Sequence, residues 1–194
     1  MRVLYVYCHP LEGSFHAAIR HEALGGLRQA GHVVDLLDLY AEGFDPVLSA
    51  GQRRDYHDPA KNRANNQAHV DRLMAAEALI VQFPTWSFGP PAMLKGWFDH
   101  LFGPGIAMDL SDPGHAKPLL THIRHIRGIA SYGRPRWQAI GMADPPRKII
   151  KRYLPWFTGG RAKVRYHAIY HMNTATLDRR CRFITAVRRE MARL

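Results

Sequence analysis

The run Arg2-Val-Leu-Tyr-Val-Tyr-Cys8 contains no polar or charged side chain after its first residue apart from two tyrosine hydroxyls. A strand with one solvent-exposed face would alternate apolar and polar residues. This continuous run is instead typical of a strand covered on both faces, as in the middle of a parallel sheet. Ser14 follows a short loop and is a favourable helix N-cap. Apolar residues then recur at helical spacing, at Ala17, Ile19, Ala23, Leu24 and Leu27. The start of the chain therefore predicts a strand followed by a helix.

The same alternation of strand and helix continues along the chain. Four further runs predict strands, over residues 32–39, 78–83, 123–131 and 163–171. Helical spacing predicts helices over residues 68–76, 92–102 and 177–193, and prolines interrupt helical pieces within 137–157. The polar segments 40–66 and 103–117 are predicted to be long loops. Five strands alternating with helices predict an α/β fold, a parallel sheet with helices on both faces, whose strand order periodicity does not determine.

The composition fits one domain spanning residues 1–194. Hydrophobic residues make up 46% of the sequence and charged residues 22%, which excludes a disordered chain. The net charge is +11, and residues 147–194 hold 13 basic residues against only Asp178 and Glu190. Such an excess can serve a nucleic acid, an anionic membrane surface or an anionic ligand. We favour a solvated helix face and expect no nucleic-acid partner.

Cysteine and histidine spacing gives no sign of a disulfide framework or a metal site. Cys8 and Cys181 are far apart, and Cys8 ends a buried strand, where it is expected to belong to the core. His167 and His171 lie on a predicted strand, where four residues span ~13 Å, so they cannot share one zinc ion. No stretch approaches the roughly 18 apolar residues of a membrane span. We therefore expect no metal, no transmembrane segment and a cytoplasmic location.

Three loops are expected to form a binding site. Ligands of open α/β sheets bind beyond the carboxyl ends of the strands, and the loops at that edge are 9–14, 84–89 and 131–137. The first loop precedes a helix N-terminus and contains His9, Gly13 and Ser14, which suits a phosphate. The sequence has neither a nucleoside-triphosphate P-loop nor the usual dinucleotide fingerprint.

The other two loops suit a flat ring system. Trp86 and Phe88 can line such a ring, and backbone N–H groups of the same loop can bond its edge. Ser131, Gly133 and the arginines after Gly133 could surround a polar end of the ring. Simpler interpretations remain open for each loop: a helix cap, a cover for the core and a surface turn.

Several short motifs, spread over residues 2–133, together resemble one family. They are His9-Pro10 with Ser14-Phe15, Asp38-Leu39-Tyr40 with Phe44-Asp45-Pro46, Phe83-Pro84 through Trp86-Ser-Phe-Gly89, and Pro91-Ala-Met-Leu-Lys-Gly-Trp-Phe98. The combination resembles the flavodoxin-like NAD(P)H:quinone oxidoreductases, also named NAD(P)H dehydrogenases (quinone). The segment around Lys95-Gly96-Trp97 is the most specific part.

The resemblance implies a fold, a cofactor and a reaction. It implies a five-stranded sheet in the order 2-1-3-4-5, a homodimer, a bound FAD or FMN, and hydride transfer from NAD(P)H through flavin N5 to a quinone-like acceptor in a ping-pong cycle. The cofactor-binding residues it implies are His9, Ser14, Phe15, His16, Pro84, Thr85, Trp86, Ser87, Phe88, Ser131, Tyr132 and Gly133. The family's Tyr and His after a Gly-Gly pair are absent, so Arg134 and Tyr132 are the candidate catalytic residues.

Two other functions are compatible with the same fold. The chain could be a regulatory flavoprotein subunit acting on a partner such as a membrane transporter, which weak turnover with tight partner binding would indicate. A one-electron carrier is disfavoured, because such carriers usually present an acidic docking face and this sequence has a pI near 10.1.

Overall fold

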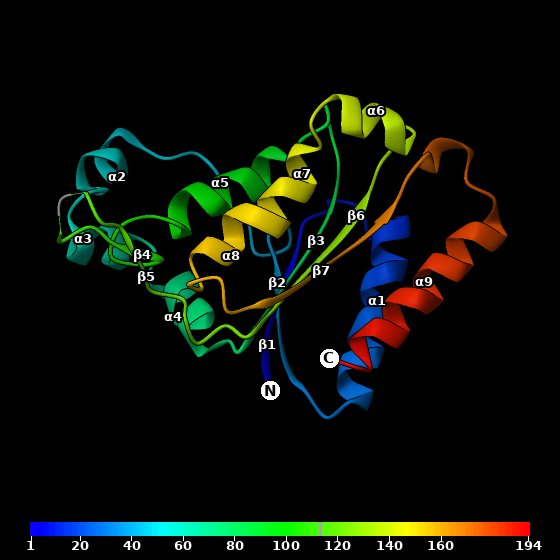
Figure 1. Cartoon of the computed structure of the whole chain (residues 1–194), viewed down its shortest axis with the longest axis horizontal. Coiled ribbons are helices and arrows are strands. Elements are labelled where there is room, and N and C mark those ends of the chain that lie inside the picture. Colours follow the sequence, from blue (N-terminus) through cyan, green and yellow to red (C-terminus); the bar gives the residue numbers. More distant parts are fainter. Residues whose placement is uncertain (113) are drawn as a thin grey trace.

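A five-stranded parallel sheet forms the centre of the computed structural model, which describes residues 1–112 and 114–194. Its strands are β1 (Arg2–Tyr7), β2 (Val33–Asp38), β3 (Ala78–Pro84), β6 (His125–Ser131) and β7 (Lys163–Ile169). Neighbouring strands bond in the order β2-β1-β3-β6-β7, and every pair is parallel (Figure 1). Counted within this sheet the order is 2-1-3-4-5, which confirms the order that the resemblance implied.

Helices cover both faces of the sheet, as the continuous apolar run of β1 predicts. Tyr5 is buried in a core cluster with α1 (Phe15–Gln29) and α9 (Leu177–Met191). Its neighbour Leu4 is buried in a second cluster with side chains of α4 (Gln67–Ala75) and α5 (Ala92–Leu101). Successive residues of a strand point to opposite faces, so β1 contributes to both cores.

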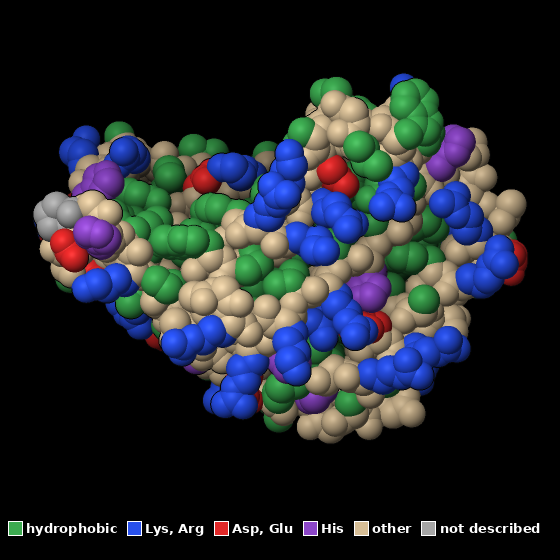
Figure 2. All heavy atoms as spheres, in the orientation of Figure 1, with side chains coloured by type: hydrophobic (Ala, Val, Ile, Leu, Met, Phe, Trp, Pro, Cys, Tyr) green, Lys and Arg blue, Asp and Glu red, His purple; other side chains and the backbone are tan. Residues whose placement is uncertain are grey.

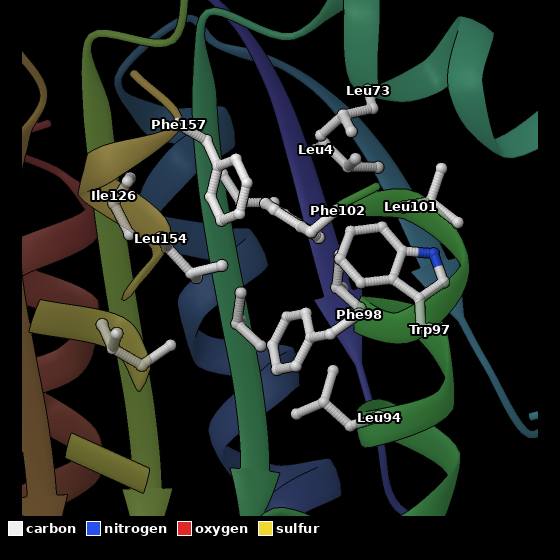
Figure 3. Packing of buried hydrophobic residues seen from close by; sticks show 14 of the residues in the cluster. Leu4, Leu73, Leu94, Trp97, Phe98, Leu101, Phe102, Ile126, Leu154 and Phe157 are labelled. Carbon is white, nitrogen blue, oxygen red and sulfur yellow. The ribbon is translucent and has the colours of Figure 1, made fainter. Parts of the chain in front are cut away.

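The second core is rich in aromatic side chains. Trp97 and Phe98 of α5 pack against Phe102, which in turn meets Phe157 with ring centroids 5.1 Å apart (Figure 3). A Cβ added at Gly96 would lie 2.3 Å from the carbonyl oxygen of Pro46. Two separate motifs of the sequence, Phe44-Asp45-Pro46 and Lys95-Gly96-Trp97, are therefore in contact. Only glycine allows the loop to cross α5 so closely.

The prediction of a continuous loop over residues 40–66 was wrong. That segment contains α2 (Ala50–Asp55) and α3 (Pro59–Asn65). Ser49 and Gln52 form a capping box at the start of α2, and Asp58 caps α3 ahead of a proline at its first position. Both helices are short and mostly polar, so they lack the apolar periodicity by which the longer helices were recognised.

One other predicted loop is partly structured, whereas the broken helical pieces predicted within 137–157 are confirmed. The segment 103–117 contains β4 (Met108–Asp109), which pairs with β5 (Lys117–Pro118) in a short antiparallel ribbon; Pro113, in the same segment, lies outside the described residues. Residues 137–157 lie in a helical run that is broken into short elements. A 3-10 helix, η2, follows β7. The elements are α6 (Arg136–Gly141), α7 (Pro145–Lys148), π-helix η1 (Ile149–Tyr153), α8 (Leu154–Trp156) and η2 (Met172–Thr174).

The ends of two predicted strands need correction. The strand expected from residue 123 begins at His125, because Leu120 and Ile123 form a buried turn joined by a backbone hydrogen bond. The strand expected to reach His171 ends at Ile169, and His171 has a left-handed backbone with φ 56°. The extended-strand distance between His167 and His171 therefore does not apply. Within the described residues, no helix is both long and apolar enough to cross a membrane.

Candidate functional site

The three loops expected at the sheet edge do meet. β1, β3 and β6 are neighbouring parallel strands, so their carboxyl ends lie side by side. The last residue of β3, Pro84, is in register with Ser131, the last residue of β6. Thr85 binds the two loops together, because its backbone N–H and its hydroxyl both donate to the carbonyl oxygen of Ser131, at 2.8 and 3.0 Å.

The first loop shapes the N-terminus of α1. Ser14 caps the helix by accepting a hydrogen bond from the N–H of Ala17 at 3.1 Å. His9 Nδ1 accepts from the N–H of Leu11 at 3.1 Å, which fixes the imidazole over the loop. In the described chain the N–H groups of Phe15 and His16 have no acceptor, as expected for a first helical turn. They remain available to an anion outside the protein.

Phe15 is turned away from this loop edge. Its ring packs against Phe183 of α9, with centroids 6.3 Å apart, and it borders the core between α1 and α9. Its side chain therefore packs between α1 and α9, and its backbone N–H is the group it can offer an anion.

A buried hydrogen-bonded chain lies beneath the three loops. Tyr5 donates to Oε1 of Gln82, and the Gln82 amide donates to the carbonyl oxygen and to Nδ1 of His16, at 2.7 and 3.1 Å. His16 Nε2 lies 2.7 Å from the hydroxyl of Ser131. The chain thus begins in the core on β1 and ends at the site on β6.

The direction of these bonds determines where the Ser131 proton points. Burial lowers the pKa of His16 to about 3, and the nearby His9 adds to the effect, so the imidazole is neutral. Because Nδ1 accepts from Gln82, the ring proton is on Nε2 and is donated to Ser131. The hydroxyl of Ser131 accepts that bond and keeps its own proton for a different acceptor.

The second loop is a tight turn with two strained residues. Trp86 and Gly89 exchange backbone hydrogen bonds at 2.8 and 3.0 Å, and the two residues between them, Ser87 and Phe88, have φ of 49° and 58°. A two-residue turn of this kind requires positive φ at both central positions, which non-glycine residues rarely adopt. The turn leaves the side chain of Trp86 45% exposed beside His9, so Trp86 is not a cover for the core.

The second and third loops enclose a cavity of about 250 Å³. Its lining residues come from both loops and from η2: Thr85, Ser87, Phe88, Tyr132, Gly133, Arg134 and Asn173. A Cβ on Gly133 would lie 3.3 Å from Oδ1 of Asn173, so the absence of a side chain there keeps the entrance open. Arg134 is exposed at the rim, where its positive charge faces the cavity.

Tyr132 lines the cavity, but its hydroxyl is already bonded on the opposite side. It donates to Asp144 Oδ1 at 2.6 Å and lies 2.6 Å from the hydroxyl of Tyr166. Its ring is stacked on Tyr170, with centroids 4.4 Å apart. Burial, followed by the neighbouring Tyr166 and Asp144, raises the pKa of Tyr132 far above its usual range. Tyr132 therefore presents its ring and backbone to the cavity, not an acidic proton.

Sequence reasoning missed several residues that shape the site. Asn173 follows β7 and reaches the cavity only through folding, and Asp144 lies in an irregular segment of unusual backbone angles. Gln82 could have been found, because it is a single amide within the otherwise apolar strand β3 and is fully buried. An uncharged polar residue at such a position must have buried partners.

Comparison with known proteins places the chain in a family. A family model described as the flavodoxin-like fold matches residues 1–159. The chain belongs to this family. The resemblance that the sequence motifs indicated is thereby confirmed for the flavodoxin-like fold.

Relatives of this flavodoxin-like protein include named oxidoreductases. NAD(P)H dehydrogenase [quinone] 1 of Cavia porcellus is 34% identical over 125 residues, covering 55% of this chain and 44% of that protein. The uncharacterized NAD(P)H oxidoreductase YcaK of Escherichia coli is 31% identical over 134 residues, covering 68% and 64%. The crystal structure of Smu.1420 from Streptococcus mutans is 27% identical, with a TM-score of 0.87 over 100% of both chains. The chain spans about half the length of the first of these curated relatives.

Proposed function

We propose that this flavodoxin-like protein is a flavin-dependent NAD(P)H oxidoreductase of the cytoplasm that reduces a quinone-like acceptor. The observation that carries the proposal is the buried chain from Tyr5, which ends at Ser131 with a hydroxyl proton that the chain does not use, directly before the cavity-lining residues Tyr132, Gly133 and Arg134. The names of the NAD(P)H oxidoreductase relatives support the same reaction class.

The residues present fit a flavin. The open N–H groups of Phe15 and His16, near His9, suit its phosphate end. The exposed Trp86 and the strained turn at Ser87 and Phe88 suit a flat ring, and Ser131 and Gly133 suit the polar edge of that ring. These features serve FAD and FMN equally. A bound flavin would supply two-electron chemistry, accepting hydride from NAD(P)H and delivering it to a quinone, nitro or azo compound.

The chain's own residues would orient the ring and balance charge around it. Ser131 would donate to a ring acceptor, and the N–H groups of the turn would bond the same edge. Arg134 would hold a fixed positive charge at the rim where negative charge develops. Tyr132 would contact the flavin ring only through van der Waals packing, because its hydroxyl is bonded to Asp144.

Flavin titration tests the proposal directly. The protein is dialysed against FAD or FMN, and the visible spectrum of the protein fraction is recorded. We expect stoichiometric retention of one of them, and retention of neither would refute the proposal. Trp86→Ala should weaken flavin binding by about 1–3 kcal/mol with little change in thermal stability, because Trp86 is 45% exposed in the free protein.

Flavin reduction tests the role of Arg134. Stopped-flow reduction by NADPH should be nearly independent of pH from about 6 to 8, because an arginine keeps its charge over that range. Arg134→Ala should lower the rate of this step by a factor of roughly 10²–10³.

Turnover with quinones also separates an enzyme from a regulatory subunit, which would turn over slowly and bind a partner tightly. Light scattering of the purified protein tests the homodimer that we propose with it.

A further inference from the structure

A second hollow, of about 380 Å³, adjoins the cavity of the candidate site. We call it the outer hollow, and its lining residues are Phe88, Arg134, Trp137, Gln138, Gly141 and Met142. It shares Phe88 and Arg134 with the cavity, and its other walls come from α6 and from Met142, which ends that helix. The two spaces therefore meet at the same two side chains.

The walls of the outer hollow are mainly apolar and aromatic. Phe88 packs against the core, and Trp137 and Met142 contribute an indole ring and a thioether. Figure 2 shows hydrophobic side chains gathered over α6, at the top of the view. Aromatic rings stack on one another, and a thioether also packs well against a ring. The lining therefore suits a flat aromatic ligand.

Arg134 is the one charged residue that lines either space, within the described residues. Its carbonyl oxygen accepts from the N–H of His171 at 2.9 Å, which ties its backbone to the residues after β7. Its exposed side chain forms no ion pair with any described residue. Asp144 lies outside both linings, and its carboxyl group accepts from the hydroxyl of Tyr132. The guanidinium of Arg134 is therefore available to an anionic ligand.

We propose that the outer hollow selects aromatic acceptors that carry one anionic substituent, such as a carboxylate or a sulfonate, and that Arg134 binds this substituent. The aromatic part of the acceptor would pack against Phe88 and Trp137, and the guanidinium would donate to the anion where the outer hollow meets the cavity. A guanidinium has five N–H donors, so binding an acceptor leaves others to face the flavin. This selection rests on the proposed function, because it names the acceptor class of that site.

A phosphate group of NAD(P)H is the other anion that could reach Arg134. Phosphates are usually bound by several cations or by backbone N–H groups at a helix N-terminus, whereas the outer hollow offers one cation among apolar side chains. A single anionic group attached directly to an aromatic ring fits this lining better. Competition by inorganic pyrophosphate distinguishes the two ligands.

Isothermal titration calorimetry with a matched pair of ligands tests the selection. Naphthalene-2-sulfonate carries the charge, and naphthalene-2-sulfonamide has nearly the same shape without it. We expect the sulfonate to bind about tenfold more tightly, because hydrogen bonds to charged groups are the stronger ones. Arg134→Gln should bring the two affinities within about twofold of each other. Trp137→Ala should weaken the binding of both ligands and leave their ratio unchanged.

Arg136→Gln is the matched control, because Arg136 is also exposed and lines neither space. It should keep the preference of the wild type for the sulfonate. Equal affinities for the two ligands in the wild type would overturn the proposal, and so would binding of neither ligand. An equal loss of preference in the control, or displacement of the sulfonate by pyrophosphate at a similar concentration, would also overturn it. Circular dichroism confirms that each variant is folded.

Flavin-loaded protein gives a second measurement. Naphthalene-2-sulfonate should slow the reoxidation of reduced flavin by 2-methyl-1,4-naphthoquinone in stopped flow, and the quinone should overcome this inhibition. Unchanged reoxidation at saturating sulfonate would show that acceptors do not use the outer hollow. The calorimetry is also done without flavin, so the two proposals fail separately. Retention of no flavin would refute the proposed function, whereas equal affinities for the two ligands would refute the selection alone.

Discussion

Ser131 and Tyr132 are consecutive residues, yet their side chains enter hydrogen-bonded networks on opposite sides of the sheet. Ser131 ends the chain from Tyr5 through Gln82 and His16, on the side of α1. Tyr132 belongs to the core beneath α5 and α8, where its hydroxyl meets Asp144 and Tyr166. Both networks are buried; Tyr132 itself lines the cavity, and Ser131 directly precedes it in the chain.

The two networks differ in whether one hydroxyl proton remains without an acceptor inside the network. In the first, every bond runs toward Ser131, so one hydroxyl proton remains for an external acceptor. In the second, Tyr166 donates to Tyr132, and Tyr132 donates to Asp144, which consumes every proton internally. The first network therefore serves the ligand, and the second stabilises the scaffold that carries it. The predictions below test this division of roles.

Removing the acceptor of the scaffold network should have the largest effect. Asp144→Ala leaves buried tyrosine hydroxyls without their acceptor and should lower the free energy of unfolding by about 3 kcal/mol or more in urea titrations. Asp144→Asn is the matched control, because asparagine also accepts hydrogen bonds and tolerates the left-handed φ of 44°. Equal losses in the two variants would contradict the assigned role of the acceptor.

Lowering the pH should reduce the free energy of unfolding through His16. Its folded pKa of about 3 lies below the 6.5 of an exposed histidine, so the unfolded chain binds a proton that the folded chain does not. Stability from this group is complete above pH 6.5 and falls as the pH drops. Between pH 6 and pH 4 the loss should be about 2.5 kcal/mol.

The comparison variant for that experiment is His16→Gln, which can still accept from Gln82 and donate to Ser131. Its free energy of unfolding should fall less steeply over the same pH range than that of the wild type. Parallel curves for the two proteins would show that His16 is not held neutral.

Ser131→Ala should weaken flavin binding about tenfold, because it removes the hydroxyl proton that the first network presents. Fluorescence quenching on titration with the retained flavin measures the dissociation constant. Ser131→Thr keeps a hydroxyl at the same atom and should bind nearly as the wild type does. If Ser131→Ala also binds normally, the outward proton has no function, although the flavin proposal itself would stand.

Tyr166→Phe should show the smallest effect. It removes one hydrogen bond at the far end of the scaffold network and should cost about 1 kcal/mol of stability. Flavin affinity should not change, since Tyr166 does not line the cavity. The division of roles treats the two networks as independent. A large loss of flavin affinity in Tyr166→Phe would contradict it by showing that the networks are coupled.

Local sequence patterns predicted the sheet and the three loops, because buried strands and long helices have strong periodicity. The strand order came from the motifs, since periodicity says nothing about which strands are neighbours. Helices α2 and α3 were missed because caps and a proline, not an apolar face, define them. Asp144 and Asn173 were missed because only the tertiary structure brings them to Tyr132 and Gly133.

The contact between α1 and α9 has a consequence for how the chain folds during synthesis. A Cβ on Gly26 would lie 2.5 Å from the carbonyl oxygen of Arg188, so the two helices touch backbone to backbone. Helix α1, which follows the first strand, can therefore complete its packing only after α9, near the end of this sequence, has been synthesised. Until α9 leaves the ribosome, the side of α1 that packs on α9 is uncovered. A nascent chain paused in this interval is the species most exposed to aggregation and most in need of a chaperone.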